Sequence, residues 1–464
     1  MGMHMKAAFV SNYINHHQIP FCNEMYRLMK GEFTFIQTEA MEAERVKMGW
    51  HEAERPAYVK CWYEEPELCR RLVMECDAVI FGGTDDESFI RERLKSGKLV
   101  LRYSERLYKT GQWKAVSPRG LRKKFLDHTR YRNARVYLLC AGAYVPSDFH
   151  IVRAYPGKMY CWGYFPETRR YDPDDLLAGK GWELPEARSC GTDALFERKG
   201  WELSETHSYD PDALQEGKDR KPASGGKVPY LLWAARMIGW KHPELALETA
   251  RYLKEHCVPF HLDMIGDGEL RQDMEELCRC FGLEEQVRFL GFHPPEQVRK
   301  YMEQADIFLA TSDRQEGWGA VVNEAMNSGC ALVADHMIGA APYLVCDGAN
   351  GFVYRDHRPR ELFARVRMLA EDRELCRRLG RNAYRTIAEV WNAENAAARL
   401  LELIEKLLSD TSAGRTAAES FPLTQGCFRG ALSPCAPAPI LSEHGAGRLI
   451  GRSVGKETNE SDDG

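Results

Sequence analysis

Short apolar runs alternate with longer helical segments through both halves of this 464-residue chain. In the first half the expected strands are Lys6–Tyr13, Phe33–Thr38, Ala78–Gly83, Leu99–Ser104, Arg135–Cys140 and Met159–Phe165. In the second half they are Val228–Ala235, Phe260–Ile265, Val287–Leu290, Ile307–Thr311, Ala331–Ala334 and Gly351–Tyr354. Helical patterns lie between the strands, including Pro243–His256, Glu269–Phe281 and Pro295–Gln304. This alternation predicts an α/β fold with two Rossmann-like parallel-sheet domains. The natural ligand site is the cleft between them.

Composition agrees with a soluble globular protein and excludes several classes. Hydrophobic residues make up 44% of the chain and charged residues 28%, which is ordinary for such proteins. The net charge of −5 gives no indication of a nucleic-acid partner. No apolar stretch reaches the roughly 18 residues that a membrane span needs. The N-terminal residues lack the apolar core and cleavage site of a signal peptide.

The 15 cysteines are scattered along the chain. Their spacing fits neither a zinc site nor a secreted disulfide framework. We interpret them as reduced thiols that serve as small core residues, which favours a cytoplasmic location.

Four segments are expected along the chain. Residues 1–166 form an N-terminal domain, 167–227 an interdomain linker or insertion, 228–408 a C-terminal domain and 409–464 a disordered tail. The tail is rich in Ser, Ala, Gly and Pro without periodicity. Two sequences of the linker recur: Tyr171–Leu176 as Tyr209–Leu214, and Lys180–Leu184 as Lys199–Leu203. We interpret this as a tandem duplication without a catalytic role.

Glu316 and Glu324 lie eight residues apart across a turn that contains Gly317 and Gly319. An apolar run precedes the turn, and a helical pattern that ends at Gly329 follows it. A strand-turn-helix unit places such a turn at the carboxyl edge of a parallel sheet. The helix start offers free N–H groups to a phosphate, and the two carboxylates are suited to hydroxyls on either side of it. The alternative is a surface loop with two unrelated solvated glutamates.

Two further strand ends carry ligand-binding signals. Arg236 and Lys241 lie five residues apart between a strand and a helix, where their charges suit a diphosphate. Gly266 and Gly268 break the next strand before a helix and would leave room for a nearby ligand. Taken singly, the two cations also fit an ordinary solvated surface, and such glycine turns are frequent.

In this order and spacing, these motifs and Val287–Gly291 closely resemble the donor-binding half of retaining glycosyltransferases of family 4, over about residues 228–355. The resemblance implies the two-domain fold called GT-B and a nucleoside-diphosphate sugar donor. It also implies transfer with retained anomeric configuration, no cofactor and no obligatory metal. The first domain resembles the family more loosely.

The resemblance also implies a role for each matched residue. Arg236 and Lys241 would neutralise the donor diphosphate, and Glu324 would accept hydrogen bonds from both ribose hydroxyls. Glu316 would position the transferred sugar and stabilise developing charge rather than act as a nucleophile. The remaining expected donor contacts are Gly266, Gly268, the base-lining residues Arg288, Phe289 and Phe292, and the amides of Gly317, Trp318, Gly319 and Ala320.

The first domain departs from the common family pattern. Where many members have a glycine pair after the first strand, this chain has His16, His17 and Gln18, and Pro20 opens the next helix. We expect these side chains to face the cleft and bind phosphate or an acceptor hydroxyl. One histidine could instead be a helix cap or a core residue. Thr84 and Glu105 lie at two other strand ends, and Glu105 stands near the place where relatives often carry a catalytic histidine. Glu316, His17 and Glu105 are therefore the catalytic candidates.

The resemblance predicts a glycosyltransferase that moves a hexose or related sugar to a saccharide or lipid-linked acceptor in surface polysaccharide assembly. A basic stretch over 119–132 could contact anionic membrane at the cytoplasmic face, or it is simply a solvated helix face. Two other functions remain open. One is a nucleotide-sugar epimerase of the same fold, and the other is a non-catalytic nucleotide-sugar binding protein.

Overall fold

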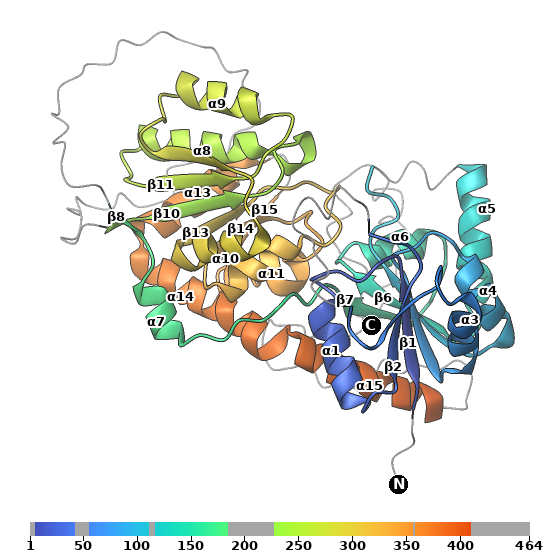
Figure 1. The fold of residues 1–464 in the computed structure, drawn as a ribbon. Coiled ribbons are helices and arrows are strands. Elements are labelled where there is room, and N and C mark those ends of the chain that lie inside the picture. Colours follow the sequence, from blue (N-terminus) through green and yellow to red (C-terminus); the bar gives the residue numbers. More distant parts are fainter. Residues whose placement is uncertain (1–4, 42–54, 111–116, 184–226, 356–357, 410–464) are drawn as a thin grey trace, which may run out of the picture.

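The computed structural model describes residues 5–41, 55–110, 117–183, 227–355 and 358–409. Two parallel sheets, each flanked by helices, form two domains that lie side by side (Figure 1). The predicted α/β class with two Rossmann-like sheets is confirmed. Within the described residues, no helix combines the length and the apolar character that crossing a bilayer requires.

The N-terminal domain is built on a seven-stranded sheet of order β3-β2-β1-β4-β5-β6-β7. Its strands are β1 (Ala7–Ser11), β2 (Phe33–Gln37), β3 (Val59–Cys61), β4 (Ala78–Phe81), β5 (Leu99–Ser104), β6 (Val136–Ala141) and β7 (Met159–Trp162). The helices between them are α1 (Ile19–Leu28), α3 (Pro66–Glu75), α4 (Ser88–Ser96), α5 (Pro118–Asp127), η2 (Thr129–Tyr131) and α6 (Val145–Ile151). The order reverses between β1 and β4, which is where parallel α/β sheets open a crevice for ligands.

The C-terminal domain is built on a six-stranded sheet of order β12-β11-β10-β13-β14-β15. Its strands are β10 (Tyr230–Ala234), β11 (His261–Ile265), β12 (Val287–Gly291), β13 (Ile307–Ala310), β14 (Ala331–Asp335) and β15 (Gly351–Tyr354). Its helical segments are η4 (Gly239–Lys241), α8 (Pro243–Glu255), α9 (Arg271–Cys280), α10 (Pro295–Gln304), α11 (Ala320–Asn327), α12 (Ala341–Leu344), α13 (Pro359–Glu371), α14 (Arg373–Arg385) and η5 (Thr386–Val390). Here the order reverses between β10 and β13, and both candidate donor motifs follow these two strands.

The central strands are buried on both faces, which explains why their sequences are nearly continuous apolar runs. The predicted strands agree with the structure to within a few residues at their ends. Sequence reasoning missed β3, because a three-residue edge strand is too short to show a period. Most of the described cysteines are buried, which confirms their interpretation as small core residues.

The described part of the expected linker packs on the C-terminal domain. Helix α7 (Pro173–Ala178) contains the first copy of the repeated sequence, and β8 (Trp182–Glu183) pairs with β9 (Lys227–Val228). The Lys180 ammonium is buried and donates to the carbonyls of Met302 and Ala305. Residues up to 183 are therefore part of that domain's surface rather than a loose connection. The second copy of the repeat and the C-terminal tail lie outside the described residues.

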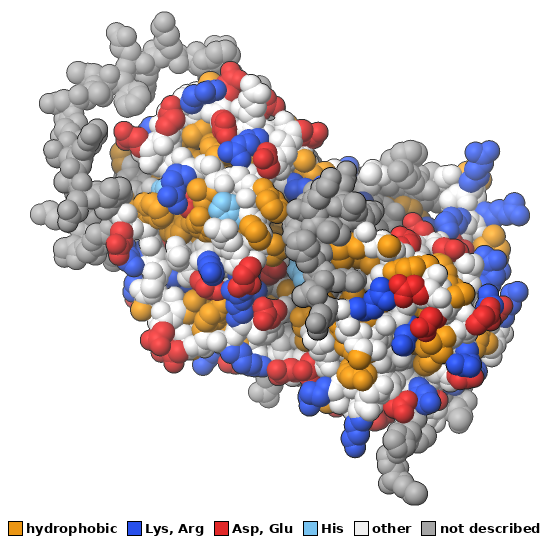
Figure 2. All heavy atoms as spheres, in the orientation of Figure 1, with side chains coloured by type: hydrophobic (Ala, Val, Ile, Leu, Met, Phe, Trp, Pro, Cys, Tyr) orange, Lys and Arg blue, Asp and Glu red, His pale blue; other side chains and the backbone are white. Residues whose placement is uncertain are grey.

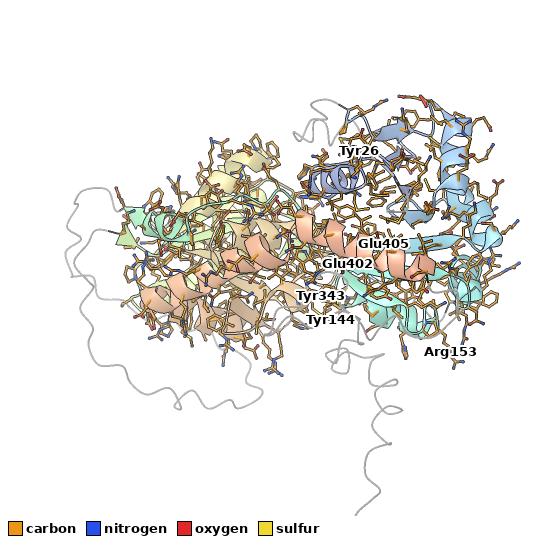
Figure 3. The ribbon with its side chains drawn as sticks, turned by 90° about the horizontal axis from the view of Figure 1, so that it is seen from below. Tyr26, Tyr144, Arg153, Tyr343, Glu402 and Glu405 are labelled. Carbon is orange, nitrogen blue, oxygen red and sulfur yellow. The ribbon has the colours of Figure 1, made fainter. Side chains whose placement is uncertain are left out.

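Helix α15 (Ala393–Ser409) begins on the C-terminal domain and crosses to the N-terminal domain, where it packs against α1. Figure 3 shows this crossing, with Glu402 and Glu405 labelled on the helix. Near its end, the Arg135 guanidinium donates to the Leu407 carbonyl. This helix thus packs on the body of the protein, and it completes the first domain rather than the second.

The two domains touch through backbone as well as side chains. The amide of Ala143, just after β6, donates to the Gly339 carbonyl at 2.9 Å. Tyr144 contacts His336 through its hydroxyl, 2.7 Å from Nδ1 and 2.9 Å from the carbonyl oxygen. Tyr144 is labelled in Figure 3 where the domains meet. The loops after β6 and β14 therefore bring the two sheets together at their carboxyl ends.

Candidate functional site

The turn between β13 and α11 has the predicted geometry. Glu316 lies in the turn, and Gly319 precedes α11 with a φ of 85°. A left-handed residue at this place favours glycine. Ala320 begins the helix, and Glu324 lies one turn inside it. The first N–H groups of α11 are thus presented at the carboxyl edge of the sheet, beside both glutamates.

Lys241 and Glu316 meet at this edge. Lys241 ends η4, which follows β10, and its ammonium contacts Oε2 of Glu316. The side chains are only 12% and 14% exposed. The Lys241 ammonium also lies 4.3 Å from the centroid of the Trp240 ring, within range of a cation–π interaction. One cation and one acid, 75 residues apart in sequence, therefore converge as expected.

The loop that carries Lys241 is tied to the glutamate turn. The Thr311 hydroxyl donates to the Lys241 carbonyl at 2.7 Å, and the Asp313 amide donates to the Trp240 carbonyl at 3.0 Å. These bonds fix the backbone of the loop from which the Lys241 side chain extends. Arg236 is exposed, with its guanidinium carbon 5.8 Å from the Trp240 ring centroid. Both predicted cations thus lie on one loop, but only Lys241 contacts Glu316 there.

Gly266 and Gly268 accommodate a neighbouring loop on the side where a Cβ would stand, and their contact with the donor stays a prediction. Both have positive φ, at 134° and 156°. A Cβ at Gly266 would overlap with the carbonyl of Ala235, and one at Gly268 would lie 2.5 Å from the carbonyl of Met237. The missing side chains let the neighbouring loop pack close. These glycines therefore support the backbone on either side of Arg236.

Glu105 reaches this site from the opposite domain. A Cβ at Gly317 would overlap with its carboxylate, so the two residues are in close contact. Oε1 of Glu105 accepts a hydrogen bond from Tyr164 at 2.5 Å, and Oε2 accepts one from Lys109 at 2.6 Å. Glu105 is thus held against the same turn that carries Glu316, so two of the three catalytic candidates border one turn.

His16 and His17, the other candidates from the first domain, lie beside Glu324. One ligand atom of each residue lies within 4.8 Å of the others. Burial lowers the pKa of His16 to about 4, and burial together with His16 lowers that of His17 well below its ordinary value. Burial raises the pKa of Glu324 to about 6, although Arg299 and Arg169 favour its charged form. Both imidazoles are therefore neutral at pH 7.

Gln18 and Thr84 make local contacts at the neighbouring strand ends. Gln18 precedes α1, where Pro20 stands in the first turn as expected, and its side chain does not cap the helix. The Thr84 hydroxyl accepts a hydrogen bond from the Asp86 amide at 3.3 Å. The adjacent Gly83 packs against Ser11 of β1. Both residues lie at the carboxyl edge of the first sheet.

The side chains of Arg288 and Trp318 are engaged in contacts within the protein. The Arg288 guanidinium donates to both carboxylate oxygens of buried Asp263, at 2.7 and 2.8 Å. It lies near the start of β12, whereas Gly291 ends that strand. The prediction that the Arg288 side chain lines the base is therefore wrong. The Trp318 ring is buried and stacks on Trp391 with centroids 5.4 Å apart, so only its backbone is available to a donor.

The two other residues of the expected base-lining segment differ in exposure. Phe289 is partly buried and packs on the core of the C-terminal domain. Phe292 is 53% exposed just after β12. An exposed aromatic ring at the carboxyl edge is free to stack on a base, so Phe292 remains a candidate. A small pocket opens at the same edge, between the ends of β10 and β13, and its lining includes Glu316, Gly319 and Ile338.

Sequence reasoning missed the residues that hold the site. His242 lies between Glu244, 2.7 Å from Nδ1, and Asp313, 3.5 Å from Nε2. Hydrogen bonding to Asp313 and then to Glu244 raises the pKa of His242 to about 10. Tyr164 and Lys109, which hold Glu105, were missed as well. A His directly after Lys241 and a Lys four residues after Glu105 were the local signals, whereas Asp313 and Tyr164 come from distant parts of the sequence.

Comparison with known proteins agrees with this geometry. Residues 215–386 match the family model described as glycosyl transferases group 1. Alpha-D-kanosaminyltransferase of Streptomyces kanamyceticus is 30% identical over 155 residues, which are 33% of this chain and 40% of that protein. Amylovoran biosynthesis glycosyltransferase AmsK of Erwinia amylovora is 27% identical over 182 residues, 38% of this chain and 44% of that protein. The chain thus spans less than half the length of these curated relatives.

Solved structures show the same fold over most of the chain. HepE of Anabaena in complex with UDP has a TM-score of 0.55 at 14% identity and covers 87% of this chain and 100% of its own. Sucrose-phosphate synthase of Thermosynechococcus elongatus has a TM-score of 0.54 at 13% identity and covers 87% and 99%. At such identities the likeness shows the fold alone. The chain therefore has the two-domain fold of GT-B glycosyltransferases, and its residues 215–386 match the glycosyl transferases group 1.

Proposed function

We propose that this protein is a retaining glycosyltransferase of family 4. It moves a sugar from a nucleoside-diphosphate sugar to a saccharide or lipid-linked acceptor, in the assembly of a surface polysaccharide or glycoconjugate in the cytoplasm. The contact between Lys241 and Glu316 beside the start of α11 carries this proposal. The names of the relatives support it, since AmsK is named for amylovoran biosynthesis and HepE was solved with UDP.

The site's charges suit the departure of a diphosphate. In the structure Lys241 neutralises Glu316. A bound diphosphate would compete for this ammonium, and the N–H groups at the start of α11 would share its negative charge. Glu316 would then face the sugar, whose anomeric carbon becomes positive as the bond to the diphosphate breaks. Glu105, held by Tyr164 and Lys109, would position the acceptor hydroxyl from the other domain.

Replacing Lys241 with methionine is expected to weaken binding of the nucleoside diphosphate about 10- to 100-fold. A charge-assisted hydrogen bond contributes about 1.5–3 kcal/mol, and methionine keeps most of the side-chain volume. A thermal-shift panel of UDP, GDP, ADP and CMP sugars first identifies the preferred nucleotide. Isothermal titration calorimetry with UDP, GDP and ADP then measures the change in affinity.

The matched control is K254M, because Lys254 is an exposed lysine on α8. Unchanged diphosphate affinity in K241M would contradict the assignment of Lys241. NMR of the product's anomeric proton tests retention separately, and inversion would refute that part of the proposal.

Contact with anionic membrane is part of the proposal, and α5 supports it. None of its residues is buried, and Leu121, Phe125 and Leu126 are 42%, 54% and 40% exposed. Figure 2 shows Lys and Arg side chains gathered at the edge of the molecule where α5 lies. Exposed apolar residues beside basic ones suit an interfacial helix.

Flotation with anionic vesicles is expected to carry the protein upward, and F125D should reduce the bound fraction at least about threefold. F292D is the matched control, since Phe292 is 53% exposed on the other domain. Equal binding to neutral and anionic vesicles, or no binding, would rule out the membrane contact.

A further inference from the structure

His16, His17 and Glu324 form a three-residue cluster between the domains. The histidines lie in the turn before α1 of the first domain, and Glu324 lies on α11 of the second. The two imidazole rings have centroids 3.8 Å apart. One ligand atom from each of the three residues lies within 4.8 Å of the other two.

We propose that His16, His17 and Glu324 bind a transition-metal ion, with Zn²⁺ as the best fit. Two imidazole nitrogens and one carboxylate oxygen are a donor set of zinc sites that keep a fourth position open to water. Imidazole also selects Zn²⁺ and similar ions over Mg²⁺ and Ca²⁺, which prefer oxygen ligands. The donor set thus points to a zinc-like ion and not to Mg²⁺ or Ca²⁺.

The cluster has nearly the right size. Zn²⁺ holds nitrogen and oxygen ligands at about 2.0–2.2 Å, so tetrahedral ligands stand roughly 3.3–3.6 Å apart. Ligand atoms already within 4.8 Å of one another can reach that spacing by side-chain rotation and shifts on the order of 1 Å.

Neighbouring contacts restrain the histidine turn. The His17 amide donates to Oδ1 of Asn15 at 3.0 Å. The His17 ring stacks on Tyr164, with centroids 5.7 Å apart and planes inclined by 18°. Tyr164 in turn donates to Glu105. Such support lowers the entropy that is lost when a ligand set becomes ordered around an ion.

The site joins the two domains, so an ion there would hold the cleft in the arrangement that the structure shows. The ion would also bind the Glu324 carboxylate, which in our proposed function accepts hydrogen bonds from the donor ribose. This second consequence rests on the proposed function, whereas metal binding itself does not.

The test is titration of chelator-treated, full-length protein with Zn²⁺ by calorimetry, and with Co²⁺ by visible absorption. We expect the wild type to bind one more ion than each of the single variants H16Q, H17Q and E324Q. Where a variant still binds that ion, its affinity should be at least about tenfold weaker than that of the wild type. H256Q is the matched control, because His256 is exposed at the end of α8 and its loss should leave this site intact.

Equal Zn²⁺ stoichiometry and affinity in the wild type, H16Q, H17Q and E324Q would overturn the proposal. Circular dichroism confirms that each variant is folded, and at least two of the three are needed for the comparison. Nucleotide binding is measured in the metal-free protein, so a failed metal site and a failed donor site give different results.

Discussion

Replacing Glu324 with glutamine is expected to weaken nucleotide binding and, above pH 6, to stabilise the protein. In the proposed function, the Glu324 carboxylate accepts hydrogen bonds from both ribose hydroxyls of the donor. An amide offers one accepting oxygen and no charge, so the loss of about 1.5–3 kcal/mol corresponds to roughly 10- to 100-fold weaker binding. Titration of the metal-free protein with the nucleoside diphosphate measures this change.

The stability change follows from burial of the same carboxyl. Its pKa rises from 4.5 to about 6 on folding, so ionisation opposes folding above pH 6. The cost is about 1–2 kcal/mol, and E324Q removes it. Well below pH 4.5 the carboxyl is protonated in both the folded and unfolded states, so the difference should vanish. Urea unfolding at pH 8 and at about pH 3.5 measures both limits.

E405Q is the control for this pair of effects, because Glu405 is exposed on α15 (Figure 3). Its substitution should change the free energy of unfolding by less than about 0.5 kcal/mol. Wild-type nucleotide affinity in E324Q would refute the ribose assignment. A variant less stable than the wild type at pH 8 would show that the Glu324 carboxylate is stabilised rather than penalised by its surroundings.

Replacing Gly142 with alanine is expected to lower turnover at least about tenfold and to leave nucleotide affinity within about threefold. Gly142 has a φ of 127°, and a Cβ there would lie 3.2 Å from the Gly317 carbonyl oxygen and 3.3 Å from Cα of Gly339. Alanine in this backbone region costs about 1–3 kcal/mol, and its methyl group requires the facing backbone at Gly317 and Gly339 to shift by a few tenths of an ångström. Because Glu105 contacts Gly317, this shift is expected to disturb the position of its carboxylate, while the donor side stays intact.

The G157A variant is the control that separates the loss of the contact between the domains from the cost of backbone strain. Gly157 belongs to the same domain and has a positive φ of 67°, but a Cβ there meets no atom within 4 Å. Its substitution should reduce the thermal stability slightly and leave turnover unchanged. If G142A and G157A lowered turnover equally, the contact between the loops after β6 and β14 would have no part in the reaction.

Much of the donor-side site could be predicted from the sequence because its signals are local. Glu316, Gly319 and Glu324 belong to one strand-turn-helix unit, whose spacing fixes which residues reach the sheet edge. The glycines at 266 and 268 were recognised, but the sequence did not show that they also accommodate the carbonyls of Ala235 and Met237, which come from another loop. Arg288 was misread for a similar reason, since its partner Asp263 lies 25 residues away.

By itself, the sequence determined the two parallel sheets, the buried thiols and the strand ends that carry charge. These follow from apolar periodicity and turn residues, which act over a few positions. Tertiary structure decided which charges meet. It placed Lys241 on Glu316, Glu105 against Gly317, and both histidines beside Glu324. Those contacts depend on how two domains dock, and docking is set by surface shape and packing between residues far apart in the chain, which no local pattern records.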